Sequence, residues 1–167
     1  MDQLYDTDIL AWSQRQAAVL RDLAARRDLP NELDLDHVAE EIEDVGRSEL
    51  NAVQSFIRLC LVHIVKAACF PRAELAPKWG EEAVRFHGDA LDRLTPSMPG
   101  SIDLDAIWRR AVREAEQSLS LYGEALPPSL PVTCPFDLNS LTATSFDLRA
   151  AIESLKPLRT GTEAEIR

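Results

Sequence analysis

The strongest constraint on the fold is an apolar stripe that stays in helical phase from Leu35 to Phe70 and stops directly before Pro71. Its members are Leu35, Val38, Ile42, Val45, Ala52, Val53, Phe56, Cys60, Ile64 and Ala67. This spacing places them on one side of an α-helix, which a following proline ends. The pattern predicts one long helix as the spine of the protein. Gly46 is a predicted kink or break, because glycine in a helix costs about 1 kcal/mol relative to alanine.

Other segments show the same periodicity more briefly. They run near 7–27, between Pro77 and Pro96, over 104–122 and, more weakly, over 136–155. The candidate N-caps are Asp6 or Thr7, Asp34 or Asp36, Ser101 or Asp103, Asp137, and Ser145 or Asp147. We find no convincing strand or repeat. The sequence predicts an all-α, single-domain helical bundle over 1–156, with about four main helices plus short C-terminal helices, and a flexible tail over 157–167.

The charge balance excludes some classes of partner. With 28 acidic and 18 basic residues, the net charge of −10 repels a phosphate backbone, so we expect no nucleic acid. Continuous apolar stretches such as 59–62 are far shorter than a spanning helix, and no signal peptide precedes them, so we expect no membrane. The three cysteines have no paired spacing, which favours free thiols and a cytoplasmic location.

The acidic segment 40–44 invites comparison with carboxylate metal sites, but its spacing fails the comparison. Those sites repeat a Glu with His three residues later, whereas here His37 precedes Glu40 and the pair occurs once. The pair Cys60 and His63 is half of a zinc site without its second half. We therefore predict no metal and no cofactor, although the three histidines leave a convergent metal triad open as an alternative.

Two polar residues on the long apolar stripe are candidate functional positions. Glu49 follows Ile42 by seven residues, so its carboxylate lies at an interface or has a partner. His63 follows Glu49 by fourteen and is either a hydrogen-bonded core residue or part of a site. Lys66, one turn later, is either a desolvated catalytic lysine or a charge reaching solvent at the helix end.

Several motifs together resemble a known family. They are Tyr5-Asp6-Thr7-Asp8 with Ala11-Trp12, Ala39-Glu40-Glu41-Ile42-Glu43, Gly46-Arg47-Ser48-Glu49, the pair His63 and Lys66, Pro71, Trp79, and Cys134-Pro135-Phe136. In order and spacing, up to about Phe146, they are similar to the bacterial domain-of-unknown-function family twenty-nine. The resemblance implies a compact all-helical domain and a bacterial source, and it implies no chemistry.

The sequence departs from the family pattern at two places. His37 stands where Asn is more usual, and Ala67-Ala68 stands where an aromatic residue often follows the lysine. The positions that remain of interest are Glu41, Glu49, His63 and Lys66, together with Gly46.

Two functional hypotheses follow. The preferred one is a protein-interaction module, plausibly a homodimer, because the second helix is over-long and Glu49 interrupts its apolar stripe. The alternative is a small enzyme or a ligand- or metal-binding bundle, with His63 and a carboxylate contributed across the helices by Glu41, Glu49, Glu81 or Glu114.

Overall fold

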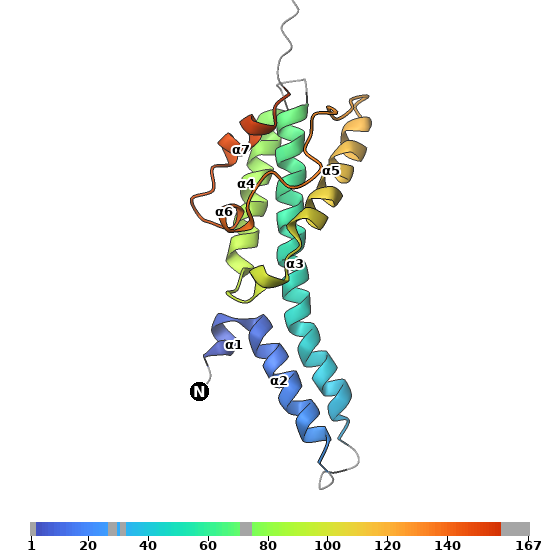
Figure 1. Ribbon diagram of the computed structural model, residues 1–167, viewed down its shortest axis with the longest axis vertical. Helices are drawn as coiled ribbons and strands as arrows, with labels where there is room; N and C mark the ends of the chain where they lie inside the picture. The colour runs from blue at the N-terminus through green and yellow to red at the C-terminus, as the bar shows by residue number, and fades with distance from the viewer. Residues whose placement is uncertain (1–2, 27–29, 31–32, 71–74, 158–167) are drawn as a thin grey trace, which may run out of the picture.

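The computed structural model describes residues 3–26, 30, 33–70 and 75–157, and within these ranges all regular structure is helical (Figure 1). The elements are α1 (Leu4–Thr7), α2 (Ile9–Ala24), α3 (Leu35–Cys69), α4 (Ala76–Arg93), the 3-10 helix η1 (Met98–Ser101), α5 (Leu104–Ser120), α6 (Leu138–Leu141) and α7 (Leu148–Leu155). The predicted all-α bundle is confirmed, with α2 to α5 as its main helices. Except for Pro157, the predicted tail lies outside the described residues.

Aspartates begin five of these helices. The side chains of Asp8, Asp34, Asp103, Asp137 and Asp147 each accept a hydrogen bond from the backbone N–H three residues later. Each bond satisfies a donor that the first turn of a helix leaves unpaired. The predicted caps Asp6 and Thr7 are wrong, because both lie in the separate turn α1 and the chain leaves the helical conformation at Asp8.

The spine α3 divides the molecule into two parts. Residues 3–49, the arm, form a hairpin in which α2 packs antiparallel to the first half of α3 (Figure 1). Residues 50–157, the body, place α4, α5 and α7 around the second half of α3. The largest fully buried side chains of the body include Leu61, Ile64, Met98 and Trp108.

Gly46 does not break α3, which is helical without interruption from Leu35 to Cys69. Its role is to let α2 approach closely. A Cβ at this position would lie 2.0 Å from Oγ of Ser13 and 3.0 Å from Cα of Leu10. The glycine is buried at the helix crossing, so packing and not flexibility accounts for it.

The carboxylate of Asp8 connects the arm to the body. Besides capping α2, it accepts hydrogen bonds from Oγ1 of Thr95 at 3.0 Å, from the backbone N of Ser97 at 2.8 Å and from Oγ of Ser97 at 2.7 Å. Thr95 and Ser97 lie in the turn between α4 and η1. We call this arrangement the Asp8 clasp. Because the carboxylate is only 5% exposed, these bonds are screened little by water.

By length and composition alone, α3 is apolar enough to cross a membrane, with a mean hydropathy of 1.5 over an 18-residue window. No apolar stretch of this length was expected from the sequence, because that expectation considered uninterrupted apolar runs and not the average over the helix. However, 56% of that window is buried inside the protein, as in the core helix of a soluble domain.

We expect Gly46→Ala to lower the free energy of unfolding by about 1–3 kcal/mol, because overpacking outweighs the propensity gain of at most about 1 kcal/mol. Gly88→Ala in α4 is the matched control, since nothing lies within 4 Å of a Cβ there. Urea unfolding measures both variants. Equal stabilisation by the two substitutions would contradict the packing role of Gly46.

The Asp8 clasp makes the stability of the fold depend on pH. Burial raises the pKa of Asp8, but the hydrogen bonds from Ser97, Ala11 and Thr95 together lower it by more. The pKa of the folded state therefore lies below the ordinary 3.8. The clasp therefore stabilises the fold above about pH 3.8 and loses this contribution as the pH falls through the folded-state pKa. Asp8→Asn should cost about 2 kcal/mol at pH 7 and progressively less below about pH 3.8. Thermal unfolding across this range checks it, with Asp6→Asn as the exposed control; a constant difference would refute it.

Candidate functional site

Lys66 lies in the last turn of α3 and is buried. The residue is 9% exposed, and its Nζ lies 4.6 Å from the centroid of the Trp79 ring on α4. Phe70 meets Trp79 edge to face at 4.9 Å and Tyr122 at 5.6 Å. Lys66 is therefore largely buried, with its ammonium group against the Trp79 ring.

The ammonium group of Lys66 makes no hydrogen bond or ion pair with any residue that the structure describes. Its contact with the Trp79 ring is a cation–π interaction. Burial lowers the pKa of Lys66, Lys78 lowers it further, and Glu82 partly opposes the change. A cation over an aromatic face recovers only part of the cost of leaving water. Lys66 is thus a buried charge without full compensation.

His63 lies one turn before Lys66 and is half-buried. Its ring stacks at 5.5 Å from that of Phe86, and its Nδ1 is buried without a hydrogen-bond partner in the described part of the chain. Burial lowers the pKa of His63, Lys66 and Arg85 lower it further, and Glu82 opposes them. The imidazole is consequently neutral at pH 7.

Glu82 and Arg85 lie on α4 above these two residues. Nη2 of Arg85 donates to Oε2 of Glu82 at 2.6 Å, and the guanidinium carbon lies 4.4 Å from the Phe86 ring centroid. Glu82 is the carboxylate that acts electrostatically on both His63 and Lys66. Sequence reasoning named Glu81 instead, one residue away and exposed, because the phase of α4 against α3 is not evident from the chain.

Comparisons with known proteins place the chain in a family. The model of the domain of unknown function DUF29 matches residues 4–147. The chain belongs to this family. A crystal structure of an α-helical protein of unknown function from Rhodospirillum rubrum ATCC 11170 is similar to it, with 41% identity and a TM-score of 0.84. The match covers 92% of this chain and 98% of the other. No curated protein matches.

Within this DUF29 chain, the four predicted positions do not converge. His63 and Lys66 are neighbours in the body, whereas Glu41 is exposed on the arm. Glu49 binds Arg93 of α4, with 2.9 Å between Oε2 and Nη1. Glu114 pairs with Arg58, so it too is engaged elsewhere.

The three histidines have separate surroundings. His37 is exposed and pairs with Asp34 at 2.5 Å, and a ring nitrogen of His87 contacts the carbonyl oxygen of Leu141 at 2.8 Å. Among the described residues, no three His, Cys, Asp or Glu side chains are grouped as metal ligands. The convergent triad that the sequence left open is therefore absent from this part of the chain.

Sequence reasoning missed Asp8, although the motif containing it was noted. The signal was present, because Asp8 directly precedes the apolar phase of α2, beginning at Ile9. Its partners Thr95 and Ser97 lie 87 and 89 residues away, a distance that no local pattern spans. A buried hydrogen bond joining such distant segments requires the tertiary structure.

Lys66→Met should raise the free energy of unfolding by about 1–3 kcal/mol at pH 7, because it keeps the apolar stem and removes an uncompensated charge. The sign follows from linkage. Because the pKa of Lys66 is lower in the folded state than its ordinary 10.5, protonation of Lys66 destabilises the fold at neutral pH. This destabilisation disappears as the pH rises above 10.5. Chemical unfolding at neutral pH tests this, with the exposed Lys78→Met as control. A strongly destabilised Lys66→Met would show that the ammonium has a partner.

Proposed function

We propose that this protein is an interaction module that forms a homodimer through one face of its arm. The arm is a hairpin of two long helices preceded by the short helix α1. Among the described residues it carries five of the nine large hydrophobic residues that are exposed: Tyr5, Val19, Leu33, Val38 and Val45. A two-helix hairpin has no third element to cover its outer faces. An apolar outer face on such an arm indicates a contact with another helix pair.

The apolar residues gather on one side of the hairpin. On α2, Trp12, Val19 and Leu23 are spaced by seven and four residues, with Tyr5 against Trp12 at 4.8 Å between ring centroids. On α3, Val38, Ile42 and Val45 have the four-three spacing of a coiled-coil seam. In an antiparallel pair both stripes flank the buried contact on the same side.

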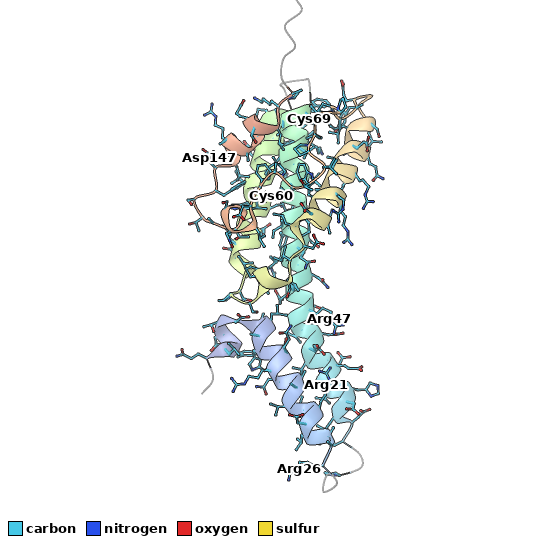
Figure 2. All side chains as sticks on the ribbon, in the orientation of Figure 1. Arg21, Arg26, Arg47, Cys60, Cys69 and Asp147 are labelled. Carbon is cyan, nitrogen blue, oxygen red and sulfur yellow. The ribbon has the colours of Figure 1, made fainter. Side chains whose placement is uncertain are left out.

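The other side of the hairpin is charged. Nη2 of Arg21 on α2 donates to Oε2 of Glu43 on α3 at 2.5 Å, and Arg47 lies nearby on α3 (Figure 2). This asymmetry distinguishes a docking face from a solvated one. It supports contact through the stripe of Val19, Val38 and Val45.

A second copy of the chain is the occupant that fits best. Two hairpins packed face to face complete a four-helix bundle with two-fold symmetry, in which the same seam lies on both sides. A helix the length of α2 spans about 24 Å, and two helices side by side cover about 20 Å in width. The plan area is about 500 Å² per copy, near the lower limit for a specific interface, so we expect a dimer of moderate affinity.

We also propose a cytoplasmic location, which the thiols support. Cys60, Cys69 and Cys134 are all free, and the first two are buried in the body (Figure 2). Burial raises the pKa of Cys60 to about 12 and that of Cys69 to about 11, so both are protonated and unreactive. Free thiols of this kind persist in a reducing compartment.

Val45→Glu should shift the mass in light scattering from twice the 18.6 kDa of one chain to 18.6 kDa, because the two-fold axis brings the new carboxylates near one another. Val84→Glu is the matched control, since Val84 is 57% exposed on α4 of the body. Monomeric wild type at about 100 μM would refute self-association, because the estimated interface predicts micromolar binding.

A further inference from the structure

Two polar groups in adjacent turns of α3 make no hydrogen bond with the described residues. The Lys66 ammonium contacts only an aromatic ring, and Nδ1 of His63 has no partner among the described residues. Either group alone costs folding free energy. The clasp around Asp8 shows that this same chain surrounds a buried charge with donors elsewhere. The two donors are therefore available to an acceptor from outside the chain.

We infer that Lys66 and His63 bind a small organic monocarboxylate between α3 and α4. One carboxylate oxygen accepts a hydrogen bond from the Lys66 ammonium, and the other accepts one from Nδ1–H of His63. Residues three apart on a helix have Cβ atoms about 5–6 Å apart, which two oxygens of one carboxylate can bridge. The inference is independent of the dimer, whose contacts lie on the arm.

The charges at this place favour a single negative charge on the ligand. Lys66 supplies one positive charge, His63 is neutral, and Glu82 and Arg85 neutralise each other. The single negative charge of a monocarboxylate therefore balances the single positive charge of Lys66. A phosphate dianion would carry an uncompensated charge next to Glu82, which already acts on both residues.

Aromatic rings of α4 lie beside both donors. Trp79 and Phe86 of α4 present ring faces to Lys66 and His63 respectively. Glu82 and Arg85 form an ion pair on the same helix, with side chains 32% and 61% exposed. An exposed pair within one helix contributes little stability, so its rearrangement for ligand entry costs little.

Nuclear magnetic resonance of the full-length protein tests the site directly. Sodium benzoate is titrated at constant ionic strength, and the indole N–H of Trp79 and the imidazole nitrogens of His63 are followed. Sodium phosphate is titrated in parallel to test a dianion. Lys66→Met and His63→Phe remove one donor each, and His63→Phe retains a ring to stack on Phe86. Lys78→Met is the control that removes an exposed positive charge from the same region.

We expect benzoate to shift both signals saturably in wild type and in Lys78→Met. Each donor variant should bind at least about tenfold more weakly, the loss that one charge-assisted hydrogen bond represents. Absence of saturable benzoate binding to wild type would overturn the site, as would unchanged binding by folded Lys66→Met. Equal binding of phosphate would overturn the assignment of a monocarboxylate.

Discussion

The whole architecture depends on α3 being one continuous helix. At 35 residues it is about 52 Å long, and it supplies one wall of the arm and the central wall of the body. At Gly46, α2 presses against the backbone of α3, since Ser13 and Leu10 occupy the space of a side chain. The close contact that excludes a Cβ at Gly46 therefore also sets the position of the arm relative to the body.

Asp8 and Lys66, the two buried charged residues in the described part of the chain, have opposite surroundings. Asp8 receives donors from two residues in one turn of the body and one donor from its own helix, which keeps its carboxylate ionised at a low pKa. Lys66 is equally enclosed but receives an aromatic face in place of acceptors. Asp8 accordingly stabilises the fold, whereas the ammonium of Lys66 weakens it.

Local chemistry explains which parts of the fold were predictable. Helical phase, prolines and aspartate caps act within a few residues, so the positions of α3, α4 and α5 follow from the sequence, as does capping by Asp34 and Asp103. The meaning of Gly46 depends on α2, whose approach is a tertiary fact. Likewise, Lys66 has the sequence context of an exposed helix end, whereas in the structure it is 9% exposed and lies against the ring of Trp79. The candidate site was thus half predicted: His63 and Lys66 were identified, whereas Glu82 and Arg85 were not.

The arm and the Lys66 region share α3 but no side-chain contact in the described structure. Val45 and Lys66 are 21 positions apart, about 32 Å along the helix, and sites that distant contribute additively unless some element has two discrete arrangements. A continuous helix fixed by the Gly46 crossing and the Asp8 clasp has one arrangement. A ligand at Lys66 would therefore stabilise the body while leaving the affinity of the arms for each other unchanged.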